Sequence, residues 1–330
     1  SWDEPGGPSR YTLARSTLVC LLSYQTTSSM GKLVHGVSTV GAVSFLLLTL
    51  ASRRSQRARF YLNSILCVIS MALSSSIGVV CGLVLSLFPG KRFNVNYIVA
   101  RSFHFFMKPL IGMYVEVEGE EHLKRRPAIM VGNHQSSIDT LYLGRMFPVN
   151  SIIMAKKELK WVPFLGQFMM LSGSAFIDRK SRASAIKTMN ATGEHMRKNN
   201  LMLFVFPEGT RSNLSTPDML PFKKGAFHLA VQTQLPIIPM VCENYHRLFD
   251  SKTRFEPGKI RLKILPPIET TGMTEKDVDM LCNTVREKML SQLLSYANDV
   301  KQQKIEASSD SSGTSSSINT RALPGLSARF

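Results

Sequence analysis

One stretch near the start of the chain limits what the whole chain can fold into. Residues 62–88 read LNSILCVISMALSSSIGVVCGLVLSLF and contain no charged side chain. A helix needs about 20 apolar residues to cross a bilayer, and this run is longer than that. A second apolar run, LVHGVSTVGAVSFLLLTLA at 33–51, has borderline length and a histidine near its start. We therefore expect a membrane-anchoring region ahead of any water-exposed domain.

Basic residues beside both runs argue against a simple hairpin of two membrane spans. The linker at 52–61 carries four arginines, residues 91–108 carry four more basic side chains, and no acidic residue occurs from Pro5 to Val115. Both basic groups would prefer the cytoplasmic side, and two full spans cannot place both of them there. An apolar segment that enters one leaflet and returns would satisfy both groups. A buried core helix, a cleaved signal peptide and a transit peptide are the alternative interpretations.

Charge and cysteine usage exclude several classes of protein. The 330 residues carry a formal net charge of +17, yet the basic residues form no stripe interleaved with aromatics and match no nucleic-acid-binding signature. Membrane surfaces and anionic small molecules are better partners for such a chain, and we expect no nucleic acid. The cysteines have no paired CxxC spacing, which disfavours a disulfide framework or a zinc site. They are Cys20, Cys67, Cys81, Cys242 and Cys282.

From about Val115 the pattern changes to short apolar runs that alternate with helical periodicity. The runs that read as buried strands are AIMVGN, SIIMA, SAFIDR, LMLFVFPEG, PIIPMV and IRLKILPPI. An amphipathic helix is predicted over 181–198, with Ile186, Met189, Gly193 and Met196 on one face. Strands alternating with helices predict an α/β fold, a layered mixed sheet with flanking helices, preceded by the membrane-anchoring helical region.

The end of the chain is predicted to hold one more helix and a tail. Thr274 and Asp277 have the spacing of a capping box at the start of a helix over 274–298. One apolar stripe on that helix comprises Val278, Leu281, Val285, Met289 and Leu293. Beyond it, the serine-rich sequence SSDSSGTSSS lacks apolar periodicity and predicts a disordered tail.

These patterns set the expected domain boundaries. An N-terminal tail covers 1–32, the anchoring region covers 33–114, the α/β domain covers 115–298 and the disordered tail covers 299–330. Within the anchoring region, FHFFMKPLIGMY at 103–114 has the aromatic and basic content of an interfacial segment, and a core helix is equally consistent with it.

Four local blocks follow or end the predicted strands. They are NHQSSID (133–139), SAFIDR (174–179), FPEGTR (206–211) with PFKKG (221–225), and LPIIPMV (235–241). In an open α/β sheet the ends of the strands are where ligand crevices form, so loops that are distant in sequence converge at one edge. We therefore expect the four blocks to contribute to one site.

His134 and Asp139 suit general base catalysis. A carboxylate bound to one imidazole nitrogen fixes the tautomer, so that the other nitrogen can accept a proton. Residues five apart on an ideal helix lie about 140° apart, so the pair requires His134 in a strand-to-helix turn and Asp139 in the first helical turns. No GxSxG elbow occurs and no cysteine lies near a histidine block, so the reacting hydroxyl must come from the substrate.

The other blocks supply positive charge suited to a phosphate group. The candidate donors are Arg179, Arg211, Lys223 and Lys224. Glu208, beside Gly209, is placed to orient Arg211 or a donor loop. No P-loop glycine pattern occurs, which disfavours ATP chemistry. A base, cations for a phosphomonoester and an apolar anchor together suit acyl transfer onto a phosphorylated, lipid-like alcohol.

The blocks also resemble a known family. NHQSSID is similar to the NHx4D block and FPEGTR to the EGTR block of the glycerolipid acyltransferase superfamily, while GSAFIDR and LPIIPMV resemble its two remaining blocks. The resemblance covers about residues 115–297, with all four motifs in order. Given the apolar segments ahead of them, the chain is most similar to the 1-acylglycerol-3-phosphate acyltransferases, which use acyl-CoA to convert lysophosphatidate to phosphatidate.

The resemblance implies a role for each candidate residue. His134 would be the base and Asp139 its orienting partner. Arg179, Glu208 and Arg211 would bind the acceptor, with Gly209 in the same substrate-binding block. Lys223 or Lys224 would contact phosphate, and Lys156 or Lys157 is a weaker candidate. The family pattern leaves the N-terminal extension and the serine-rich tail unexplained.

The resemblance also implies the reaction's partners and setting. Acyl-CoA would be a co-substrate, no cofactor or metal is expected, and the sn-2 hydroxyl would attack the thioester directly without an acyl-enzyme. A membrane location is expected, with the endoplasmic reticulum favoured and lipid droplets or mitochondrial membranes left open. The alternatives are glycerol-3-phosphate or another lysophospholipid as acceptor, and a catalytically idle lipid-binding protein.

Overall fold

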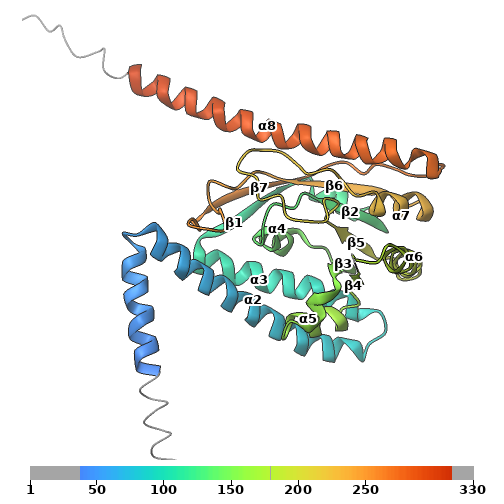
Figure 1. Cartoon of the computed structure of the whole chain (residues 1–330), viewed down its shortest axis with the longest axis horizontal. Coiled ribbons are helices and arrows are strands. Elements are labelled where there is room, and N and C mark those ends of the chain that lie inside the picture. The colour runs from blue at the N-terminus through green and yellow to red at the C-terminus, as the bar shows by residue number, and fades with distance from the viewer. Residues whose placement is uncertain (1–37, 179, 314–330) are drawn as a thin grey trace, which may run out of the picture. The chain divides into compact units, whose positions relative to one another are not determined.

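The computed structural model describes residues 38–178 and 180–313 (Figure 1). Arg179 and the predicted N-terminal tail at 1–32 lie outside the described residues, and so does the chain beyond residue 313. The chain divides into two units, one ending at Leu62 and one beginning at Asn63.

Both predicted apolar runs form helices. The first run becomes the helix Ser38–Ser52, and the second becomes α2 (Gln56–Ser86), the one described helix that is long and apolar enough to cross a membrane. Serines inside α2 do not disturb the helix, because the Ser70 and Ser74 hydroxyls each donate to the carbonyl four residues earlier, at 2.7 Å. The hydroxyl groups are thereby satisfied without water.

The chain after α2 forms η1 (Lys91–Asn94), α3 (Val95–Ile111) and β1 (Met113–Glu118). Of the two interpretations of residues 103–114, the core helix is confirmed for one face, since Phe103, Met107 and Ile111 are buried. Strand β1 was not predicted. It is an edge strand with alternating burial, and its outward Glu116 pairs with Lys259 at 3.1 Å.

Seven strands form one sheet in the order β1-β7-β6-β2-β5-β3-β4. All six predicted runs contain strands: β2 (Ala128–Gly132), β3 (Ser151–Lys156), β4 (Ala175–Ile177), β5 (Met202–Val205), β6 (Ile237–Cys242) and β7 (Gly258–Ile264). Neighbouring strands are parallel, except that β6 and β7 are antiparallel. The sheet is therefore mixed, as predicted, and the carboxyl ends of β2, β5 and β6 lie side by side at one edge.

Helices cover both faces of the sheet (Figure 1). On one face lie α3, α4 (Asp139–Met146) and α5 (Leu165–Leu171), with the part of α2 from Asn63 onward packed outside them. On the other face lie α6 (Arg182–Asn199), α7 (Gly225–Thr233) and α8 (Val278–Gly313). Short turns of 3₁₀ helix complete the fold: η2 (Glu120–Lys124), η3 (Lys157–Trp161) and η4 (Glu275–Asp277).

The buried faces of α8 and α6 agree with the predicted ones, apart from Ile186 on α6. Thr274 and Asp277 form the predicted capping box, and the whole predicted stripe of α8 is buried in the main core. On α6, Met196 is buried, whereas Ile186 is 50% exposed and does not belong to the buried face.

The predicted disorder from residue 299 is wrong for the first part of the tail, because α8 continues to Gly313. The segment KQQKIEA at 301–307 consists mostly of strong helix formers, which accounts for the continuation of the helix.

Candidate active site

The predicted pair meets at the edge formed by β2. His134 lies in the turn after β2 and Asp139 is the first residue of α4, as the sequence required. The imidazole Nδ1 lies 2.7 Å from Asp139 Oδ2, with 17% and 2% of the two side chains exposed. An ionised carboxylate can only accept, so Nδ1 carries the proton. The other nitrogen, Nε2, keeps its lone pair and can act as a base.

Asp139 is held by more than the histidine. Its Oδ2 also accepts from the backbone N–H groups of Gln135 (2.7 Å) and Ser136 (3.0 Å), and its Oδ1 accepts from the Tyr245 hydroxyl at 2.5 Å. Burial raises the pKa of Tyr245 well above its ordinary value, so the phenol keeps its proton and remains a donor. Four donors thus fix the carboxylate, and a fixed carboxylate fixes the imidazole.

The ring of His134 is also positioned by the strand next to it. Phe206, which follows β5, stacks on the imidazole with ring centroids 3.8 Å apart and an angle of 18° between the planes. The contact limits rotation of the imidazole about its side-chain bonds. The FPEGTR block therefore helps to orient the base before substrate arrives.

Glu208 connects the two motifs from a buried position. Its Oε1 accepts from the backbone N–H of His134 at 2.7 Å, and its Oε2 accepts from that of Leu220 at 3.0 Å. Burial raises the pKa of Glu208. Among the described residues it forms no ion pair with Arg211, so the geometry favours the role of holding a loop over that of orienting this arginine.

Backbone hydrogen bonds join the 206–213 loop to the turn that carries His134. We call His134 and Asp139 the dyad. The N–H of Ser212 donates to the carbonyl of His134 at 2.8 Å, and the N–H of Asn213 donates to that of Gln135 at 3.0 Å. We call these two bonds, together with the Glu208 contact to His134, the motif bridge. It holds the 206–213 loop in register with the base.

Residues that the sequence analysis did not single out join this edge to β6. Asn133 donates from Nδ2 to the carbonyl of Cys242 at 2.9 Å and accepts on Oδ1 from its N–H at 2.8 Å. Gln135 donates from Nε2 to the carbonyl of Glu243 at 2.8 Å. The convergence of strand ends was the signal that could have identified Asn133, Gln135 and Tyr245, because all three lie at or just beyond the ends of predicted strands.

The predicted cations differ in how their charge is balanced. Lys224 pairs with Asp279 at 2.7 Å. Arg211 and Lys223 are exposed, and no ion pair to either is found within residues 38–178 and 180–313. Lys223 lies over Gly209, where an added methyl group would come within 2.8 Å of the lysine Cδ and Cε. Arg211 and Lys223 are therefore available to an anionic substrate.

The weaker candidates are already engaged. Lys156 lies 3.7 Å from Glu158, and Lys157 lies 2.5 Å from Asp178. Both pairs are largely exposed, so such contacts stabilise little and could exchange for a substrate anion.

We predict that Glu208→Gln slows the reaction without removing the base. An amide keeps one acceptor oxygen and turns an N–H toward a backbone donor, leaving a buried group unsatisfied at a cost of about 1–3 kcal/mol. If half or more of that cost appears in the positioning of His134, kcat/KM falls by about 2- to 150-fold. The measurement is kcat/KM together with a melting curve, and the control is Glu269→Gln, which alters an exposed partner of Arg125. A rate equal to that of the parent would contradict the bridging role.

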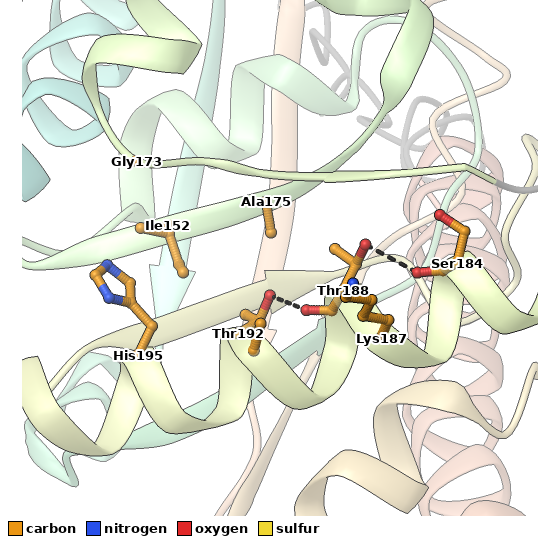
Figure 2. Close-up of a pocket in the computed structure, with 9 residues that line it drawn as sticks. Ile152, Gly173, Ala175, Ser184, Lys187, Thr188, Thr192 and His195 are labelled. Atoms are coloured by element: carbon orange, nitrogen blue, oxygen red, sulfur yellow. Dashed lines mark hydrogen bonds between the residues drawn. The ribbon is translucent and has the colours of Figure 1, made fainter.

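A hollow of about 390 Å³ lies beside the SAFIDR block (Figure 2). Its lining comes from β3, β4 and α6 and includes Gly173, Ala175, Lys187 and His195. The hydroxyls of Thr188 and Thr192 donate to backbone carbonyls of α6, at 3.0 and 2.7 Å, so they face the hollow mainly as acceptors. Neither His134 nor Asp139 lines this hollow.

The described residues contain no group of three or more histidine, cysteine, aspartate and glutamate side chains arranged to hold a metal ion. This edge of the sheet holds a histidine base with a fixed tautomer beside two unbalanced cations, Arg211 and Lys223, which have no ion pair among the described residues. That arrangement can remove a proton from a hydroxyl group on a phosphorylated molecule.

Comparisons with known proteins agree with this chemistry. Residues 114–243 match the family model described as acyltransferase. The chain is 44% identical to the 1-acyl-sn-glycerol-3-phosphate acyltransferase of Saccharomyces cerevisiae, over 72% of this chain and 78% of that protein. It is 39% identical to the human 1-acyl-sn-glycerol-3-phosphate acyltransferase alpha, over 62% and 72% of the two chains.

A solved structure is similar as well. The crystal structure of the 1-acyl-sn-glycerophosphate acyltransferase PlsC from Thermotoga maritima matches with a TM-score of 0.54 and 26% identity. The match covers 71% of this chain and 97% of that one.

Proposed function

The chain belongs to the 1-acyl-sn-glycerol-3-phosphate acyltransferase family, and we propose that its His134–Asp139 dyad acylates lysophosphatidate with acyl-CoA as the donor. The chain is an enzyme, and its product is phosphatidate. One observation carries the catalytic assignment: Nδ1 of His134 is bound to a buried carboxylate, which leaves Nε2 as the base.

The proposed step is a direct transfer. Nε2 of His134 takes the proton of the sn-2 hydroxyl while that oxygen attacks the thioester carbonyl of acyl-CoA. The C–S bond of the tetrahedral intermediate then breaks, and the imidazolium returns the proton to the leaving thiolate. The backbone N–H groups of Thr210 and Arg211 are the donors proposed for the oxyanion. The products are phosphatidate and free coenzyme A, and His134 ends in its starting state.

The acceptor phosphate is assigned to the unbalanced cations. Arg211 follows Gly209 and precedes Ser212, which is bonded to His134, so its backbone lies next to the base. Lys223 reaches the same turn from the other side. Arg179 keeps the role that its motif implies, and the ion pair with Asp279 makes Lys224 a weaker candidate than Lys223.

The membrane setting follows from the surface of α2. Its Val80, Leu83 and Val84 are 63%, 57% and 52% exposed, which is unfavourable in water and favourable in a bilayer. The helix is also packed against α5 through Gly78 and Gly82. The part of α2 from Asn63 onward is thus attached to the domain, and we infer that it lies within one leaflet, an arrangement that lets both groups of basic residues stay on the cytoplasmic side. The endoplasmic reticulum membrane is the proposed location.

The function is tested by offering three acceptors in parallel. Membranes that contain the protein receive acyl-CoA with lysophosphatidate, glycerol-3-phosphate or lysophosphatidylcholine, and the acylated products are quantified. We expect phosphatidate to form fastest, because the two cations match a phosphomonoester without a further head group, and the apolar anchor suits an acceptor with a long acyl chain, which glycerol-3-phosphate lacks. A faster reaction with either of the other acceptors would reassign the substrate, and no transfer to any of them would leave only the lipid-binding alternative.

A second test concerns the planar guanidinium of Arg211, which can donate two parallel hydrogen bonds to a phosphate. Lysine keeps the charge but cannot form two parallel hydrogen bonds, so Arg211→Lys should lower kcat/KM for lysophosphatidate by about 10- to 150-fold while sparing the KM for acyl-CoA. Arg125→Lys is the matched control, because its fork pairs with Glu269 on an exposed surface. If instead the KM for acyl-CoA rises and that for lysophosphatidate is unchanged, Arg211 contacts the phosphates of coenzyme A.

A further inference from the structure

A second apolar surface lies beside α2, in the segment that joins β3 to β4. Trp161 at the end of η3 is 85% exposed, Phe164 is 53% exposed, and Met170 on α5 is 49% exposed. Large aromatic side chains are buried on average in soluble proteins, so an indole this exposed is unusual. We call Trp161, Phe164 and Met170 the η3–α5 patch.

The backbone of this segment is strained at one of these residues. Phe164 has φ 61° and ψ −45°, a conformation that bulky side chains rarely adopt. Glycine would adopt it without strain. In the isolated protein Phe164 stays 53% exposed, so packing within the chain buries only about half of this strained residue.

Lysines precede the patch in the chain. The segment KKELK at 156–160 carries three lysines and one glutamate. Lys160, which directly precedes Trp161, lies over the Phe176 ring with Nζ 4.9 Å from the centroid. Aromatic rings next to lysines are the side chains found where a protein meets the head-group layer of a membrane, and the excess positive charge complements anionic lipids.

The patch continues into the exposed surface of α2. Gly78 and Gly82 have no side chains to hold α5 away, and an added methyl group would come within 3.0 Å of Phe168 and 2.9 Å of Leu171. Figure 1 shows α5 next to α2 on the face of the sheet that is opposite α8. The exposed apolar side chains of both helices therefore lie on one side of the domain.

The patch also lies at the catalytic edge. Segment η3 follows the carboxyl end of β3, which is separated from β2 by one strand, β5. Neighbouring strands are about 4.8 Å apart, so the ends of β2 and β3 lie about 10 Å from each other. A surface that holds η3 in the head-group layer brings the turn of His134 close to that layer.

We propose that the η3–α5 patch inserts into the head-group layer of an anionic bilayer leaflet, as a docking site separate from the apolar anchor. Trp161 and Phe164 enter the boundary between head groups and acyl chains, and Lys156 and Lys160 contact lipid phosphates. The patch then orients the catalytic edge toward the leaflet, so that a lipid acceptor reaches the dyad without crossing water. Docking of this kind depends on surface chemistry and would hold in a variant without activity.

Fluorescence tests the insertion directly, because the chain has only two tryptophans, Trp2 and Trp161. The full chain carrying Trp2→Phe is reconstituted into vesicles of phosphatidate and phosphatidylcholine, with the latter brominated on its acyl chains in one sample. We expect blue-shifted emission and loss of most of the Trp161 intensity in the brominated sample. The control carries Trp2→Phe, Trp161→Phe and Met280→Trp, which places the indole at a 57% exposed site on α8, and should keep its emission.

The opposite results overturn the proposal. Quenching of Trp161 by aqueous iodide and not by brominated lipid would show that the indole faces water. Quenching by neither reagent would show that protein covers it, for example a second copy of the chain.

A kinetic test separates docking from folding and from catalysis. The double variant Trp161→Ser, Phe164→Gly removes both rings and relaxes the strained backbone. It should lose about tenfold in rate on long-chain lysophosphatidate in anionic vesicles and keep the parent rate on a water-soluble, short-chain lysophosphatidate. The matched control, Met280→Ser with Leu294→Ser, removes two exposed apolar side chains from α8 and should keep both rates. Equal losses on both substrates would assign the patch to the reaction or to stability and not to docking.

Discussion

Replacing His134 with alanine should lower kcat by about 10²- to 10⁴-fold while the protein stays folded and membrane-bound. The base is lost, but the motif bridge survives, because the backbone N–H and carbonyl of residue 134 still bond to Glu208 and Ser212. The measurement is phosphatidate formation at matched protein level in isolated membranes, and the melting curve should remain close to that of the parent.

His195→Ala is the matched control for that variant. His195 is also a partly buried histidine, whose pKa is lowered by desolvation and by Arg92 and Lys198, but it lies on α6 away from the dyad. Its replacement should leave the rate close to that of the parent. Substantial transfer by the His134 variant would remove this histidine from the mechanism.

Asp139→Asn should cost about 10²- to 10⁴-fold in kcat, although the two side chains have nearly the same shape. The carboxylate accepts from His134, two backbone N–H groups and Tyr245, and an amide has a single acceptor oxygen. If the amide nitrogen faces the imidazole, it donates to Nδ1, and the proton must then sit on Nε2. The imidazole can no longer accept a proton from the substrate in that tautomer.

The same substitution should also destabilise the fold, because a donor placed against buried donors costs about 1–3 kcal/mol. The test is therefore kcat measured below the lowered melting temperature. Asp279→Asn is the control, since it removes an exposed carboxylate that pairs with Lys224. A folded Asp139→Asn protein with near-parent kcat would mean that this carboxylate is structural and that another group sets the tautomer.

The sequence predicted the strands and the dyad well because each rests on a short-range signal. Apolar runs bounded by glycine, proline or charge mark β2–β7, and five-residue spacing across a turn is enough to pair His134 with Asp139. The capping box at Thr274 is equally local. Such features depend on a few neighbouring residues, so they can be predicted without knowledge of the fold.

The contacts that hold the site are long-range and could not be predicted from the sequence. Glu208 is followed by a glycine in a turn, where most carboxylates face water, and only the fold shows that it is 3% exposed beneath His134. Tyr245 reaches Asp139 across 106 positions in the chain. Strand β1 was missed because it pairs at the sheet edge and its alternating glutamates resemble a surface loop.

The motif bridge also determines which traits of this enzyme can be altered separately. Thr210 and Arg211 are exposed between two anchored points, Glu208 and Ser212. Substitutions at 210 and 211, and at Lys223 across the turn, leave those anchors and the base undisturbed. Head-group preference can therefore be redesigned by exchanging a few exposed side chains, whereas insertions or deletions between 208 and 212 would shift the loop against the histidine and cost the reaction itself.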